Sequence, residues 1–211
     1  GFYDDVVEPG PEEIVVIKKV PVPEEKIKSR AGVGRLLRDV HGYEIINGMY
    51  NFPTCTVCGV QSGYTGVGQK TVLPAKAMVK LDMRLVPNQD PDDIHEKLLR
   101  HLRSKGLENI SVRVLSKAYP SKTAVTHPVI PLIYELGVQA YGKNPVIEPL
   151  STGTGPRYIF SSWTDMPMVA LGVSNAGSNA HAPNENIYLA DYLPGVKHVA
   201  LIISGFGSYT K

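Results

Sequence analysis

The stretch AMVKLDMRLVPNQDPDDIHEKLLRHLRSKG, residues 77–106, carries the two clearest secondary-structure signals of the chain. Apolar and polar side chains alternate along residues 77–86, which is the pattern of a strand with one buried face. The polar face carries Lys80, Asp82 and Arg84, and Pro87 ends the strand. An arginine on such a face is in most cases a solvated charge, so the strand alone assigns Arg84 no role.

A helix is predicted directly afterwards, over residues 90–105. Asp90 is its N-cap, Pro91 occupies the first helical position, and acidic residues follow in the first turn. Basic residues crowd its last turn before Gly106. The predicted buried stripe consists of Ile94, Leu98 and Leu102.

Two further β segments flank this strand–helix unit. Residues 54–62 are β-rich, and apolar side chains alternate again at Ile110, Val112 and Val114. Strands surrounding one long helix predict an α+β sandwich, with helices on one face of an antiparallel sheet. Nearer the N-terminus we expect a short strand or extended arm at residues 13–20, a helix at 23–38 weakened by Gly32 and Gly34, and a loop at 43–50.

The second half alternates helices and strands at the spacing of an α/β domain. After a linker at residues 118–126, helices are predicted at 128–141, from 157 onward and from Asp191 onward. Short strands are predicted at 146–150 and 168–171. The predicted core stripe of the last helix consists of Leu193, Val196, Ala200 and Ile203.

Composition indicates an ordinary globular protein, with 43% hydrophobic and 20% charged residues among 211. The net charge of +2 suggests neither nucleic acid nor an anionic membrane as a partner. No apolar run approaches the roughly 20 residues of a membrane span. Cys55 and Cys58 form no disulfide framework or zinc ribbon and are expected in the core. We therefore expect a cytoplasmic location.

Two loops could carry chemistry. Residues 175–186, NAGSNAHAPNEN, surround His181 with small polar residues, and Pro183 prevents a helix from continuing through the loop. His181 is either a ligand or a solvated histidine in a turn. Residues 151–156, STGTGP, precede the helical segment at Arg157. That glycine loop is either a carboxylate-binding helix start or an ordinary turn.

Several motifs taken together resemble a known family. They are HAPNEN at 181–186, TVLP at 71–74, KLDMRLVP at 80–87, GTGP at 153–156, GFYDDV at 1–6, PTCTVCG at 53–59 and SGYTG at 62–66. The chain resembles the di-zinc amidohydrolases that include carnosine dipeptidase, glutamate carboxypeptidase, aminoacylase and succinyl-diaminopimelate desuccinylase. The resemblance extends over essentially the whole chain, and the order and spacing of the motifs are more specific than any one of them.

The resemblance implies a two-part architecture. Residues 1–117 would form an α+β sandwich lid that mediates dimerisation and lacks its first strand and helix. Residues 118–211 would form the C-terminal part of a zinc-binding α/β catalytic domain. The whole enzyme would hold two zinc ions, or other divalent metals, and form a homodimer through its lid.

The resemblance also assigns roles to residues. His181 matches the family's last metal ligand, and Arg84 matches a lid arginine that binds the substrate carboxylate. Thr154 and Gly153 match the catalytic-domain loop that binds the same carboxylate, and Thr71 lies where the lid lines the substrate site. Arg157 falls where desuccinylase-like members have an arginine, although their loop has an aspartate and a small residue in place of Gly155-Pro156.

The family's remaining metal ligands and its general-base glutamate would lie upstream of Gly1, so no catalytic residue is expected in these 211 residues. We expect a part of a zinc carboxypeptidase or dipeptidase, inactive alone. The parent would hydrolyse the amide bond of small peptides or N-acyl amino acids with a free carboxylate. The alternative is a non-enzymatic dimerisation or interaction module derived from that family.

Overall fold

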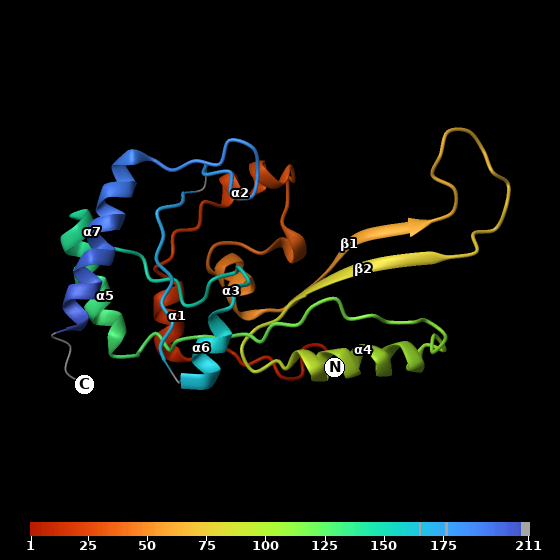
Figure 1. Cartoon of the computed structure of the whole chain (residues 1–211), viewed down its shortest axis with the longest axis horizontal. Helices are drawn as coiled ribbons and strands as arrows, with labels where there is room; N and C mark the ends of the chain where they lie inside the picture. Colours follow the sequence, from red (N-terminus) through yellow and green to blue (C-terminus); the bar gives the residue numbers. More distant parts are fainter. Residues whose placement is uncertain (165, 176, 208–211) are drawn as a thin grey trace. The chain divides into compact units, whose positions relative to one another are not determined.

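The computed structural model describes residues 1–164, 166–175 and 177–207, and its elements are drawn in Figure 1. The chain divides into two compact units. The first unit consists of Gly1–Glu8 and Gly48–Pro120, and the second of Pro9–Asn47 and Ser121–Lys211. The chain therefore passes between the units near residues 8, 47 and 120. The functional division at residue 117 that the sequence suggests stays a prediction.

The first unit contains an antiparallel hairpin and one long helix. Strand β1 (Thr54–Ser62) pairs with β2 (Ala77–Arg84), with Thr54 opposite Arg84 and Ser62 opposite Ala77. The register shifts between Val57 and Gly59, so that Cys58 is the extra residue of a bulge. Helix α4 (Pro91–Ser104) begins at Asp90, whose side chain accepts hydrogen bonds from the backbone N–H groups of Asp92 and Asp93. The predicted strand and helix, and the α+β class, are confirmed.

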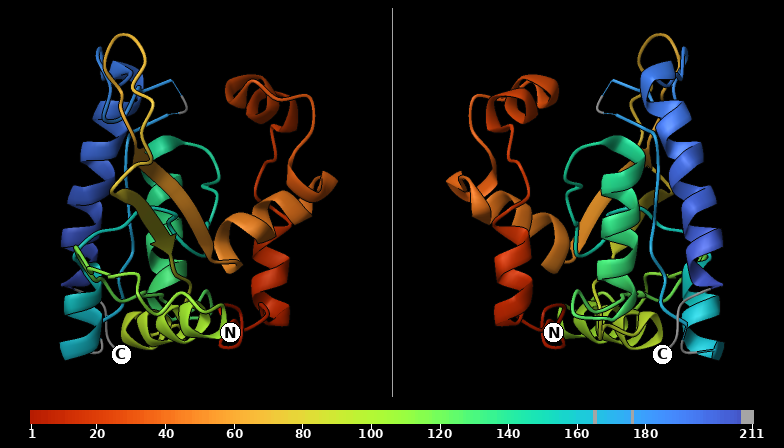
Figure 2. Two further views of the ribbon diagram at one scale, coloured as in Figure 1. Left: turned by 90° about the vertical axis from the view of Figure 1, so that its right-hand side faces the viewer. Right: turned by 90° about the vertical axis from the view of Figure 1, so that its left-hand side faces the viewer.

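The second unit is built from helices. They are α1 (Pro11–Ile17), α2 (Glu24–Ala31), the 3₁₀ turn η1 (Leu37–Asp39), α5 (Val129–Tyr141), α6 (Arg157–Thr164) and α7 (Leu189–Phe206). Helix α3 (Tyr43–Asn51) passes from this unit into the first. Helices α5 and α7 pack side by side (Figure 2). Among the described residues, no helix is both long and apolar enough to cross a membrane.

The N-terminal predictions need two corrections. Residues 13–20, expected as a strand, contribute to helix α1, because Pro11 is placed at its start and Glu12 and Glu13 lie in its first turn. The segment around Tyr43, expected as a loop, is helix α3, which buries Ile45 and Ile46. In both segments burial of one helical face outweighs weak local propensity. Helix α2, by contrast, stops at Gly32 in the left-handed conformation, well short of residue 38.

Three expected strands are not formed in the described part of the chain. They are the segments at residues 110–114, 146–150 and 168–171. A strand needs a hydrogen-bonded neighbour, and the only sheet described consists of β1 and β2. Met168 instead has both backbone groups satisfied by Thr123, whose Oγ1 accepts from Met168 N at 2.7 Å and donates to its carbonyl at 2.9 Å.

Helix α7 buries a different face from the one predicted. Leu193, Val196 and Ile203 are exposed, with Leu193 and Ile203 at 70% and 72%. The buried positions are Gly195 and His198, and His198 Nε2 lies 3.1 Å from the carbonyl oxygen of Ile133 on α5. On α7 the contact with α5 uses glycine and histidine, with Gly205 close to Leu136 of α5, so the predicted apolar stripe of α7 is left on the surface of this chain.

The two cysteines also depart from expectation. Cys55 and Cys58 are exposed free thiols on β1 and not core residues. The reason is that the hairpin itself is exposed, including apolar residues on the face that the alternation predicts to be buried. Those residues are Val57, Val60, Val79 and Leu81. Cys58 Sγ donates to the carbonyl oxygen of Lys80 at 3.5 Å.

Candidate functional site

The candidate carboxylate-binding arginine lies at the end of β2. Arg84 belongs to the polar face of the strand, as its alternation predicts, and its side chain is about half exposed. Its Nε donates to Asp82 Oδ2 at 2.7 Å. The carboxylate of Asp82 therefore orients the guanidinium, whose planar fork of N–H donors matches a carboxylate in geometry.

Thr71 lies in the same unit, in the connection between β1 and β2. This connection covers residues 63–76 and holds Gly63 and Gly68 in the left-handed conformation. Thr71 is exposed, next to a turn in which Val72 N donates to the carbonyl oxygen of Lys70. A hydroxyl on an exposed loop can donate to a ligand oxygen, which is all that this position alone supports.

The glycine loop of the second unit leads into α6 as predicted. Gly153 and Thr154 are exposed, and Gly153 N donates to Ser151 Oγ at 3.4 Å. Helix α6 begins at Arg157, which is half-buried, and Ile159 N donates to the carbonyl oxygen of Pro156. Gly153, Thr154 and Arg157 are thus brought together at one helix start by their closeness in sequence. Backbone N–H groups and a guanidinium at such a start suit a carboxylate.

His181 occupies the tip of the loop at residues 175–186, of which Ala176 lies outside the described residues. The imidazole is exposed, and the backbone of His181 has φ +62°, a conformation that favours glycine. The turn is closed by Ala182 N, which donates to the carbonyl oxygen of Asn179 at 2.9 Å. A non-glycine residue held in this conformation is typical of a functional position.

The described residues contain one candidate metal ligand and not a complete metal site. No group of three histidine, cysteine, aspartate or glutamate side chains converges within residues 1–164, 166–175 and 177–207. A zinc ion in a protein needs three or four protein ligands. His181 suits the role of one such ligand, because its imidazole is accessible, but the other ligands would have to come from outside the described residues.

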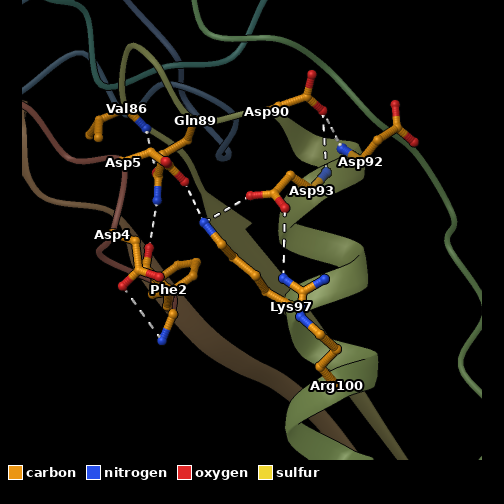
Figure 3. A network of polar contacts seen from close by, with 11 residues as sticks. Phe2, Asp4, Asp5, Val86, Gln89, Asp90, Asp92, Asp93, Lys97 and Arg100 are labelled. Atoms are coloured by element: carbon orange, nitrogen blue, oxygen red, sulfur yellow. Dashed lines mark hydrogen bonds and ion pairs between the residues drawn. The ribbon is translucent and has the colours of Figure 1, made fainter.

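A polar network in the first unit escaped sequence analysis (Figure 3). The Lys97 side chain, 13% exposed, forms ion pairs with Asp5 and with Asp93, the latter at 2.8 Å. Gln89, 3% exposed, accepts from Val86 N at 3.1 Å and donates to the carbonyl oxygen of Phe2 at 2.7 Å. Together these contacts fasten the N-terminal segment to the start of α4.

These ion pairs shift the pKa values of both partners. The hydrogen bond from Lys97 lowers the pKa of Asp93, and the hydrogen bonds to Asp5 and Asp93 raise the pKa of Lys97. The spacing of Asp93 and Lys97, four residues apart on a helix, was visible in the sequence. The sequence contains no such spacing signal for Asp5 or Gln89, because Asp5 pairs with Lys97 and Gln89 with Phe2, which are distant along the chain.

A second charged cluster holds α2 in the other unit. Glu24 lies 2.6 Å from Lys28 Nζ and 2.8 Å from His41 Nδ1. The hydrogen bonds from Lys28 and then His41 lower the pKa of Glu24 to about 2. The cluster joins the start of α2 to the segment before α3. All of its members have partners in one another, so the cluster is structural and not a ligand site.

Comparison with known proteins shows what the chain is similar to. Residues 40–110 match the model of the peptidase dimerisation domain. The structure of the M20 family metallo-carboxypeptidase Sso-CP2 from Sulfolobus solfataricus is 37% identical, with a TM-score of 0.88 over 99% of this chain and 48% of that one. The Beta-Ala-His dipeptidase of Homo sapiens is 24% identical over 93% of this chain and 40% of its own length. The Cys-Gly metallodipeptidase dug1 of Schizosaccharomyces pombe is 22% identical over 93% and 42%.

These matches confirm the resemblance inferred from the motifs. They extend over nearly the whole chain, which spans less than half the length of each relative. The family model covers the hairpin, α4 and the segment before them, which is the part expected to be a lid. The chain is therefore similar to M20 metallopeptidases over nearly its whole length, and its residues 40–110 match the model of the peptidase dimerisation domain.

Proposed function

We propose that the chain is a part of a zinc-dependent exopeptidase, a carboxypeptidase or dipeptidase acting on small peptides or N-acyl amino acids with a free carboxylate. The observation that carries this proposal is the 37% identity with the Sulfolobus metallo-carboxypeptidase over 99% of this chain. The relatives whose names specify a substrate are dipeptidases, for β-Ala-His and for Cys-Gly. Substrates of that size expose a carboxylate close to the bond that is cleaved.

In this proposal the chain's own residues bind and orient the substrate. Arg84 binds the free carboxylate through its fork of N–H groups, with Asp82 holding the guanidinium in place. Thr154 and Gly153, with Arg157 as a further contact, offer a position for a substrate carboxylate at the start of α6, and Thr71 offers a hydroxyl from the connection between β1 and β2. Fixing the substrate by its carboxylate aligns the amide bond for attack, which is how orientation contributes to rate.

His181 is the residue we assign to the metal. It would hold one of two zinc ions, or of other divalent ions, and a metal pair of this kind supplies a bound water of lowered pKa. The remaining ligands are absent from the described residues, and we therefore propose that the 211-residue chain alone is inactive. The exposed apolar stripe of α7 supports this proposal, because an α/β domain ordinarily covers such a stripe with its sheet.

The test is a pair of hydrolysis assays on dipeptides with zinc present, one with the purified chain and one with a longer parent protein that includes it. We expect turnover by the parent alone, and turnover by the purified chain, with contaminants excluded, would contradict its inactivity. In the parent, His181→Ala is expected to abolish hydrolysis and reduce the zinc content measured by atomic absorption. Full zinc content in that variant would remove His181 from the metal.

We further propose that the parent is a cytoplasmic homodimer. The match of residues 40–110 to a dimerisation domain and the exposed apolar face of the β1–β2 hairpin support self-association. The two free thiols support a reducing compartment. The same observations favour the alternative, a non-enzymatic dimerisation module. A dimer seen by sedimentation, with no hydrolysis by any longer form of the protein, would favour that alternative.

A further inference from the structure

The loop that presents His181 is closed at its base by backbone pairing with Asn186. Asn186 N donates to the carbonyl oxygen of Ser178 at 2.9 Å. The Asn186 side chain adds hydrogen bonds from Nδ2 to the carbonyl oxygens of Asn184 and Gly177, at 2.9 and 3.4 Å. One asparagine therefore joins both ends of the segment that contains His181.

Ser178 forms the inner side of this closure. It is 3% exposed in a loop that is otherwise mostly exposed. Its Oγ accepts a hydrogen bond from Asn175 N at 2.7 Å, and its backbone N donates to the carbonyl oxygen of Asn175 at 3.0 Å. Asn175 Oδ1 in turn accepts from Gly177 N at 2.7 Å. Ser178 and Asn175 thus hold each other by reciprocal hydrogen bonds.

The closure is needed because the tip has an unfavourable backbone. Asn179, His181 and Asn184 have φ values of 52°, 62° and 63°. Asparagine and histidine adopt this region more often than most residues, but for any residue other than glycine it remains an uncommon conformation. A residue remains in such a conformation only where the surrounding contacts fix it. The hydrogen bonds of Ser178, Asn175 and Asn186 are the described contacts that do so.

Asn175 has a further property. Its Nδ2 is buried and has no hydrogen-bond partner among the described residues. An unsatisfied buried donor is unfavourable, and in native proteins it is met by an acceptor. The base of the loop therefore has a buried donor that no described residue satisfies.

We propose that Ser178, together with Asn175 and Asn186, is a positioning residue for His181. The three side chains lock the loop so that the imidazole is presented in one orientation before any ligand arrives. None of the hydrogen bonds described for these side chains goes to the imidazole, so they act through the backbone on either side of it. That His181 binds a metal rests on the proposed function, whereas the locking of the loop concerns this chain alone.

The first experiment measures amide hydrogen exchange of the 211-residue chain by NMR, comparing Ser178→Ala with Ser174→Ala. Ser174 is exposed and serves as the matched control. The decisive probe is the amide of Asn186, because its acceptor, the backbone carbonyl of Ser178, is present in both variants. We expect this amide and that of Ala182 to exchange at least about 10-fold faster in Ser178→Ala, and to be unchanged in Ser174→Ala.

Three results would overturn the proposal. The first is that the amides of Asn186 and Ala182 exchange at an unchanged rate in Ser178→Ala, and that the amide of Ala182 does so in Asn186→Ala as well. This result would show that these contacts do not lock the loop. An equal acceleration in Ser174→Ala would show that any change in the segment has this effect. Loss of the whole far-UV circular dichroism spectrum in both Ser178→Ala and Asn186→Ala would make these residues general determinants of folding.

A second experiment links the loop to the metal in a longer parent protein. Ser178→Ala is expected to raise the zinc dissociation constant about 10- to 100-fold, as is typical for residues that orient a ligand. The value of kcat at saturating zinc should stay within about twofold. An unchanged zinc affinity in Ser178→Ala, with a lowered affinity in His181→Ala, would refute the positioning role only. An unchanged zinc affinity in His181→Ala would refute the proposed role of His181 as a metal ligand. The hydrogen-exchange experiment would then still test whether Ser178 locks the loop.

Discussion

Gln89 donates a hydrogen bond from Nε2 to the carbonyl oxygen of Phe2 at 2.7 Å, across 87 residues of sequence. The same side chain accepts from Val86 N, so it joins the end of the β2 segment to the N-terminal segment. Lys97, in the second turn of α4, adds its ion pairs with Asp5 and Asp93. Residues 1–8 are held in the first unit by these contacts, although the residues that follow belong to the second.

Replacing Gln89 should therefore destabilise the first unit. In Gln89→Ala the buried Val86 N–H loses its acceptor, and an unsatisfied buried group costs about 1–3 kcal/mol. We expect the free energy of unfolding from urea denaturation to fall by that amount. Glu96→Ala on the exposed side of α4 should change it by less than about 0.5 kcal/mol. Equal effects of the two substitutions would refute the role of Gln89.

The Glu24 cluster should make stability depend on pH in acid. The pKa of Glu24 falls from 4.5 to about 2 in the folded chain, so its charged form is the one that folding favours. Its contribution is fully present above its ordinary pKa of 4.5 and is lost as the pH falls toward 2. Lys28, whose pKa is raised by its hydrogen bond with Glu24, remains protonated through this window.

Thermal unfolding of Glu24→Gln and of the unchanged chain measures this contribution. The variant should have the lower Tm at neutral pH, and the difference should vanish as the pH approaches the folded pKa of about 2. Glu25→Gln, whose side chain is 88% exposed, is the control and should show a small difference at every pH. A difference between Glu24→Gln and the unchanged chain that persists at the acid end would contradict the assignment.

The helix α1 that replaced an expected strand can be tested through its buried face. Ile17 is fully buried, whereas Val15 on the same helix is 54% exposed. Ile17→Ala should lower the free energy of unfolding by about 2–5 kcal/mol, because it removes buried methyl groups and leaves a cavity. Val15→Ala should lower it by less than about 1 kcal/mol. A strand at this segment would place residues 15 and 17 on the same face and give similar values.

Arg84 makes the proposed contact to the substrate carboxylate, and substrate chemistry can test it. In an active parent protein, Arg84→Ala should reduce kcat/KM about 10- to 150-fold on substrates with a free terminal carboxylate, the range of a lost charged hydrogen bond. Substrates with an amidated terminus should be affected far less. Equal losses on both substrates would show that Arg84 acts on the fold and not on the carboxylate.

The sequence by itself determined the parts whose signals are local. The strand at residues 77–84, helix α4 with its cap at Asp90, helix α5 ending at Gly142 and the start of α6 at Arg157 all follow from alternation, capping and proline or glycine placement. The motifs that carry the family resemblance were also visible as short runs, and the comparisons confirm the resemblance. The roles of His181, Arg84, Gly153, Thr154, Arg157 and Thr71 stay predictions.

Only the tertiary structure decided in which segments burial of apolar side chains outweighed the local secondary-structure propensity. It also decided which residues distant in sequence form hydrogen bonds. The β-branched segment of α1 and the glycine-containing segment of α3 are helical because their apolar faces are buried, and pattern alone does not distinguish these outcomes. The expected strands near residues 112, 148 and 170 find no pairing partner among the described residues. The hydrogen bonds of Gln89 with Phe2 and of Ser178 with Asn175 do not follow from any periodic pattern in the sequence. Only the folded chain identifies them.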